Sequence, residues 1–168
     1  DSNRVLLTDG RSAAYDILII ATGVSPAPDQ VEGMLNESWR KDVHEFYTFE
    51  GAVALGERLR GWKGGRLVIH ICEMPIKCSV APLEFAFLTD SWLTEHGLRE
   101  KTEIVYVTPL SGAFTKPIAS GILGHLLEEK RISVVHDFSI ANVDSGRRRI
   151  VSWDDKEVPY DLLVSVPP

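Results

Sequence analysis

The sequence has 168 residues, of which 44% are hydrophobic and 25% are charged, and its formal net charge at pH 7 is -6. This composition is typical of one globular domain with a real core, and no apolar run approaches the ~20 residues of a membrane-spanning helix. The negative charge argues against nucleic acid or an anionic membrane as the main partner.

One pattern occurs at both ends of the chain. The motif YDILIIATG at residues 15–23 and the similar YDLLVSVPP at residues 160–168 each follow a hairpin-like stretch, residues 4–11 and 149–156. Each motif predicts an apolar strand after a turn at Asp-Gly or an Asp pair. We expect residues 17–24 to form a buried strand, and the repetition suggests one domain of a larger protein.

The elements between these motifs alternate in type. Residues 23–43 are rich in Pro, Gly, Asp and Asn and predict an irregular crossing segment. After them the hydrophobic pattern predicts helices over residues 50–60, 82–96 and 118–130, strands over 66–71, 103–107 and 132–135, and a hairpin over 139–153. The helix over 82–96 has Pro82 at its first position and Gly97 after its end, both of which are typical boundary residues.

This order of elements predicts the fold class. Strands that alternate with helices form a parallel sheet with right-handed crossovers. We therefore expect an α/β fold, a Rossmann-like parallel sheet with helices on both faces and an added β-hairpin or meander.

The turn after the first central strand is the expected place for chemistry, because ligands of such sheets lie beyond the carboxyl ends of strands. It reads CEMPIKCSVA, residues 72–81, and contains no glycine, which argues against a pyrophosphate bound by the usual glycine-rich turn. Cys78 lies just before the helix with Lys77 beside it, and a helix dipole and a cation both favour a thiolate. Cys78 is thus a candidate nucleophile, with a small buried side chain as the alternative, whereas Cys72 is expected in the core.

No metal site is expected. The two cysteines are too few for a disulfide scaffold and are not spaced for zinc. The histidines form no i,i+3 or i,i+4 ligand pair, and we interpret them as structural or surface residues: His44, His70, His96, His125 and His136.

The turn and the helix after it carry a resemblance to a known family. The run PIKCSVAPLE, residues 75–84, resembles the signature of sulfide:quinone oxidoreductases and flavocytochrome c sulfide dehydrogenases, a branch of the FAD-dependent pyridine nucleotide-disulfide oxidoreductase superfamily. Residues 15–23 resemble the strand that closes the FAD domain in that superfamily. The chain departs from the pattern at Val80, where the turn usually has glycine, and at Tyr47, where three-cysteine members have a further cysteine.

The resemblance implies a flavoprotein that oxidises sulfide. Residues 1–48 would be the end of the FAD-domain strand and a crossing segment, and residues 49–168 a second nucleotide-binding-like domain. Cys78 would carry sulfide-derived sulfur, and electrons would pass through FAD to a quinone or to cytochrome c. The positions implied at the cofactor are Ala21, Thr22, Gly23, Lys77 and Pro82.

Two other functions stay open. One is an NAD(P)H-binding domain of a disulfide reductase or NADH dehydrogenase relative, and the other is a redox-silent assembly module. The resemblance allows a homo-oligomer, a peripheral membrane, cytoplasmic or periplasmic location, and membrane contact only through regions outside these residues. FAD is not expected on this chain alone.

Overall fold

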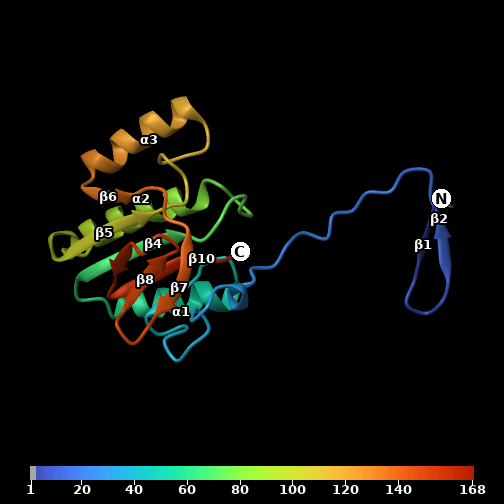
Figure 1. Cartoon of the computed structure of the whole chain (residues 1–168), viewed down its shortest axis with the longest axis horizontal. Coiled ribbons are helices and arrows are strands. Elements are labelled where there is room, and N and C mark those ends of the chain that lie inside the picture. The colour runs from blue at the N-terminus through green and yellow to red at the C-terminus, as the bar shows by residue number, and fades with distance from the viewer. Residues whose placement is uncertain (1–2) are drawn as a thin grey trace.

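The computed structural model describes residues 3–168 as an α/β body that carries an extended N-terminal arm, residues 3–25 (Figure 1). The arm begins with the antiparallel hairpin of β1 (Arg4–Leu6) and β2 (Ser12–Ala14). Gly10 closes the turn with a φ of 85°, a left-handed conformation that glycine adopts without strain. The hairpin expected over residues 4–11 is therefore confirmed.

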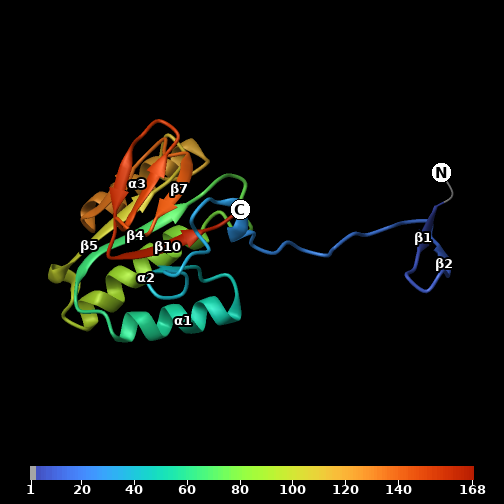
Figure 2. The ribbon, with the colours of Figure 1, turned by 60° about the horizontal axis from the view of Figure 1, so that its bottom comes forward.

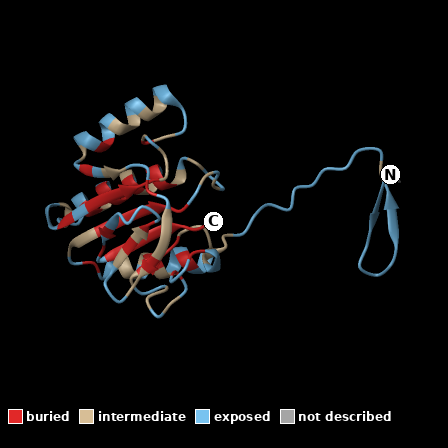
Figure 3. Ribbon diagram, viewed as in Figure 1, coloured by how far each residue is buried: buried red, intermediate tan, exposed pale blue. Residues whose placement is uncertain are grey.

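The predicted buried strand over residues 17–24 is wrong. These residues run as extended chain with no strand partner among residues 3–168, and Ile17, Ile19 and Ile20 are 83%, 82% and 77% exposed. Figure 3 shows the arm exposed along its length beside a body with a buried centre. An apolar strand is buried only when neighbours pair with it and cover its faces, and the described part of the chain supplies none.

The body is built on a five-stranded, all-parallel sheet with the order β3-β10-β4-β5-β6. The predicted strands over residues 66–71, 103–107 and 132–135 are confirmed, and β10 confirms the strand expected at the end of the chain. The sheet also contains a short edge strand that the sequence did not reveal. The strands are β3 (Val43–His44), β4 (Gly65–Ile71), β5 (Thr102–Val107), β6 (Ile132–Val135) and β10 (Leu162–Val166).

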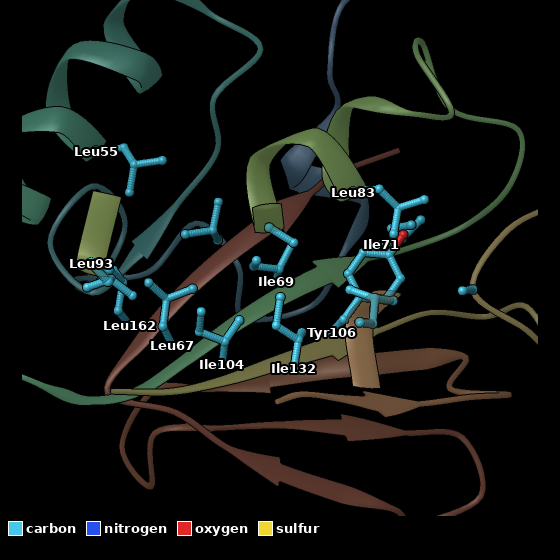
Figure 4. Packing of buried hydrophobic residues seen from close by; sticks show 14 of the residues in the cluster. Leu55, Leu67, Ile69, Ile71, Leu83, Leu93, Ile104, Tyr106, Ile132 and Leu162 are labelled. Atoms are coloured by element: carbon cyan, nitrogen blue, oxygen red, sulfur yellow. The ribbon is translucent and has the colours of Figure 1, made fainter. Parts of the chain in front are cut away.

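All three α-helices pack on one face of the sheet, which corrects the expectation of helices on both faces. The crossovers from β3 to β4, β5 and β6 all advance in the same direction along the sheet, so right-handed connections place every helix on the same side. Figure 4 shows the resulting core, in which Leu55, Leu83 and Leu93 face Leu67, Ile69 and Ile104 of the sheet, and Leu127 joins the same cluster. The helices are α1 (Phe49–Arg60), α2 (Ala81–Glu95) and α3 (Pro117–Glu129).

An antiparallel meander covers the opposite face, as Figure 2 shows with α1 and α2 on the other side of the sheet. Phe138, Val143 and Ile150 pack there against Val68 and Val105 in a second buried cluster. The crossing segment adds Val31 and Met34 to this cluster and includes the single turn η1 (Pro28–Gln30). The meander consists of β7 (Ile140–Asp144), β8 (Arg149–Ser152) and β9 (Glu157–Pro159).

The remaining element is the short turn η2 (Arg99–Lys101), which connects α2 to β5. The α-helices have 12, 15 and 13 residues. Across residues 3–168, none of the helices combines the length and apolar character needed to cross a membrane. The predicted boundary between residues 48 and 49 stays a prediction, although Val43 packs in the same core as the sheet.

Candidate functional site

The candidate site is the turn that connects the carboxyl end of β4 to the first residue of α2. The last residues of this turn are hydrogen-bonded to the first turn of α2. Ala81 N donates to Cys78 O at 3.2 Å, and Glu84 N donates to Val80 O at 3.0 Å. Cys78 therefore lies just before the N-terminus of a 15-residue helix, where a helix dipole favours negative charge.

The two cysteines of this turn lie in opposite environments. Cys78 and the neighbouring Lys77 are exposed, whereas Cys72 is buried, and both thiols are free. The structure thus excludes the alternative in which Cys78 is a small core residue, and it confirms Cys72 as one. An exposed thiol beside an ammonium group at a helix N-terminus is a suitable nucleophile.

Cys72 belongs to a buried polar cluster inside the sheet. Its Sγ lies 3.4 Å from Ser165 Oγ and 3.8 Å from His70 Nδ1, and His70 Nδ1 lies 3.0 Å from Ser165 Oγ. Burial raises the pKa of Cys72 to about 12 and lowers the pKa of His70 to about 3. Both groups are therefore neutral at physiological pH, so this cluster is structural.

Tyr47 connects the segment before α1 to the cysteine turn. Its hydroxyl donates to Cys78 O at 3.2 Å, across 31 residues of sequence. Burial raises the pKa of Tyr47 to about 12, so the hydroxyl stays protonated and acts as a donor at physiological pH. The sequence identified Tyr47 only as a position where related proteins have cysteine, and no local pattern predicts a hydrogen bond of this span.

A small cavity of about 130 Å³ lies beside Tyr47 and Lys77. The base of the arm forms one wall, because Ala27 N donates to Pro168 O at 2.6 Å and thereby places the arm against the end of β10. The other lining residues are mostly apolar: Val24, Ser25, Pro26, Pro75, Ile76, Val166, Pro167 and Pro168.

The predicted cofactor positions are only partly brought together. Ala21, Thr22 and Gly23 are exposed in the arm, next to the residues that line the small cavity, whereas Pro82 is buried in the first turn of α2. Gly23 has a φ of 69° and a Cβ there would meet no atom within 4 Å, so its surroundings are open. Their contacts with a cofactor stay predictions.

A larger hollow of about 510 Å³ lies at the carboxyl ends of β4 and β5, where dinucleotides bind in related folds. Its lining includes Glu73, Met74 and the exposed Trp153. No glycine lets the backbone of the turn approach a phosphate, and the Glu73 carboxylate repels one. Within residues 3–168, no three His, Cys, Asp or Glu side chains gather in a way that could hold a metal ion.

Comparisons with known proteins point in one direction, although no family model matches the chain. The chain is 24% identical to the mitochondrial sulfide:quinone oxidoreductase of Dictyostelium discoideum and 22% identical to that of Mus musculus, in both cases over 100% of its own length. The chain is a distant homologue of the sulfide:quinone oxidoreductases. The crystal structure of the sulfide:quinone oxidoreductase from Aquifex aeolicus superposes on 99% of the chain with a TM-score of 0.76 and 20% identity.

The resemblance inferred from the cysteine turn and the predicted α/β class are thereby confirmed. The chain spans 38% and 39% of the two sulfide:quinone oxidoreductase sequences and 39% of the superposed chain. It corresponds to a domain of these oxidoreductases, and no functional residue is assigned by the comparison itself.

Proposed function

We propose that this chain is the central domain of an FAD-dependent oxidoreductase that oxidises sulfide and passes electrons to a quinone, with Cys78 as the redox residue. The observation that carries the proposal is the exposed Cys78 thiol beside Lys77, immediately before α2 and at the carboxyl edge of the sheet. Similarity to sulfide:quinone oxidoreductases along the whole of this chain supports the proposed substrate and acceptor.

The proposed role of Cys78 is to accept the sulfur of sulfide. A bond forms between the Cys78 thiolate and the sulfur of HS⁻, and the product is a persulfide, with release of two electrons. A bound FAD would supply the two-electron acceptor, and a quinone that takes up these electrons with two protons becomes a quinol. Lys77 and the N-terminus of α2 favour the anionic sulfur before the bond forms.

Under this proposal the described residues would form one edge of a flavin site. Gly23 and the cavity beside Lys77 leave open space at the base of the arm, and we propose that FAD approaches there, near Ala21, Thr22, Gly23, Lys77 and Pro82. The sequence contains no glycine-rich dinucleotide turn that would complete the site. Transfer to cytochrome c and assembly as a homo-oligomer stay predictions for the whole protein.

The test uses the full-length protein, sulfide and a short-chain quinone. We expect Cys78→Ser to abolish sulfide-dependent reduction of the flavin while FAD stays bound, because serine keeps the size of the side chain but cannot carry a persulfide. Cys72→Ser is the matched control, and it should retain flavin reduction because Cys72 is buried in the sheet. Flavin reduction by Cys78→Ser at the parent rate would contradict the proposal.

A further inference from the structure

Tyr47 contacts the cysteine turn at the carbonyl group from which α2 begins. Cys78 O accepts two hydrogen bonds, from the Tyr47 hydroxyl at 3.2 Å and from Ala81 N at 3.2 Å. The second bond belongs to the entrance of α2, but the first comes from a distant segment. Loss of the Tyr47 hydroxyl would leave Cys78 O with the hydrogen bond from Ala81 N alone.

The backbone of Tyr47 is itself fixed by a buried carboxylate. Glu45 is 2% exposed, and its Oε2 accepts from Tyr47 N at 2.5 Å and from Thr48 N at 2.9 Å. Thr48 also donates its hydroxyl to Glu45 and caps α1 by accepting from Gly51 N at 2.9 Å. Gly51 makes room for this carboxylate, because a Cβ there would overlap with it.

The ring of Tyr47 is held by aromatic stacking that continues to α2. Tyr47 stacks on Phe46 with a centroid distance of 4.9 Å, and Phe46 stacks on Phe85 of α2, also at 4.9 Å. The N-terminus of α1 and the first turns of α2 thus hold the phenol between them. Such a group is preorganised, because its own rotamer and backbone are determined by other contacts.

We propose that Tyr47 is a positioning residue that holds Cys78 at the N-terminus of α2 through the hydrogen bond to its carbonyl oxygen. The meaning of this role for sulfide oxidation rests on the proposed function, but the geometric role does not. Tyr47 acts through the backbone of Cys78, so it is not a catalytic residue.

The test is alkylation of Cys78 by iodoacetamide across pH 6 to 10 in the 168-residue chain, with Cys78 identified by mass spectrometry. We expect Tyr47→Phe to slow alkylation at pH 7 by about threefold to tenfold, the population change that loss of one hydrogen bond produces. Cys78 then spends less time at the N-terminus of α2, where a helix dipole favours an anion. The two rates should converge at high pH, where the thiol ionises in both proteins.

Tyr15→Phe is the matched control, because Tyr15 lies in the arm and away from the cysteine turn. Superimposable profiles for Tyr47→Phe and the parent would overturn the proposal. Faster alkylation at every pH would also overturn it, since general loosening exposes the thiol without changing its charge. If circular dichroism shows that Tyr47→Phe does not fold, Phe85→Leu replaces it, because it weakens the aromatic stack and keeps the Tyr47 hydroxyl. Phe85→Leu should slow the alkylation of Cys78 by a smaller factor. An unchanged alkylation rate would overturn the proposal.

Failure of this inference and failure of the proposed function are distinguishable. Alkylation requires neither sulfide nor flavin, so a positive result with Tyr47→Phe stands even if Cys78→Ser still reduces flavin with sulfide. Conversely, loss of sulfide oxidation in Cys78→Ser together with an unchanged profile in Tyr47→Phe would remove only the role of Tyr47.

Discussion

At the scale of single residues, the cysteine turn places one cysteine in the protein interior and the other at the surface. Cys72 is 4% exposed and bonded to Ser165, whereas Cys78 faces water. The sequence predicted the burial of Cys72, which continues a buried strand, but it left open whether Cys78 is an exposed nucleophile or a small buried residue. It could not predict the partners of Cys72, since Ser165 lies at the other end of the chain and becomes a neighbour only through the pairing of β4 with β10.

We predict that the two thiols differ strongly in reactivity. At pH 8, iodoacetamide should modify Cys78 at least about tenfold faster than Cys72, because burial raises the pKa of Cys72 to about 12 and keeps it protonated. Mass spectrometry of peptides from a time course measures both rates. The Cys72→Ser variant should leave the Cys78 rate unchanged, and equal rates at the two positions in the folded chain would refute the prediction.

A second prediction concerns His70, whose pKa burial lowers from 6.5 to about 3. Between pH 6.5 and 3, His70 binds a proton in the unfolded chain but stays neutral in the folded chain. Its contribution to the free energy of unfolding is therefore fully present above pH 6.5 and is lost as the pH falls toward 3. This group should contribute a slope of up to about 1.4 kcal/mol per pH unit in that window. Urea unfolding at several pH values measures it.

His70→Asn should flatten this slope, because asparagine can still bond Ser165 but does not titrate. His125→Asn is the control, since the side chain of His125 is 72% exposed and should leave the slope intact. An unchanged slope in His70→Asn would show that other groups cause the acid sensitivity.

At the scale of elements, Arg99 joins α2, β5 and the end of α3. Its Nε contacts Asp90 Oδ1 at 2.6 Å, and its two Nη atoms donate to the carbonyl oxygens of Thr102, Lys130 and Arg131. Burial raises the pKa of Asp90, but hydrogen bonds from Lys130 and Arg99 outweigh it, and the pKa lies below its ordinary value. Asp90 is therefore ionised although it is buried, and its charge depends on these two cations.

We predict that Arg99→Ala lowers the free energy of unfolding by about 2 kcal/mol, because Asp90 keeps only Lys130 as a partner and three carbonyl oxygens lose their donor. Chemical denaturation measures this change. Arg11→Ala, which breaks the exposed Arg11–Asp9 pair of the arm, should change it by less than about 1 kcal/mol. Similar effects of the two substitutions would mean that Arg99 is not a structural connection between the elements.

The elements also show where prediction from sequence ends. Hydrophobic period and boundary residues located α1, α2, α3 and the central strands. The same reasoning failed for residues 17–24. An apolar pattern predicts that a strand would be stable when buried, but it does not show whether neighbouring strands are present to pair with it. Tyr47 was missed as a contact of Cys78 for a related reason, since its hydrogen bond depends on how α1 and α2 pack.

At the scale of the whole molecule, the sheet is that of a dinucleotide-binding fold, but its first turn is not. We predict that the chain binds neither NADH nor NADPH appreciably, because the turn offers no glycine for a close backbone approach and places Glu73 near the phosphate position. Calorimetric titration measures the binding, with an NADH-dependent reductase as the positive control. A dissociation constant in the low micromolar range would favour the NAD(P)H-binding alternative.

The exposed arm has a consequence for how the chain behaves in concentrated solution. The run Ile17-Leu18-Ile19-Ile20 carries no charge and no proline and is rich in β-branched residues. Its backbone pairs with no strand within residues 3–168. Segments of this kind pair with copies of themselves. Unless another strand covers it, this exposed run is expected to make the chain aggregate as its concentration rises.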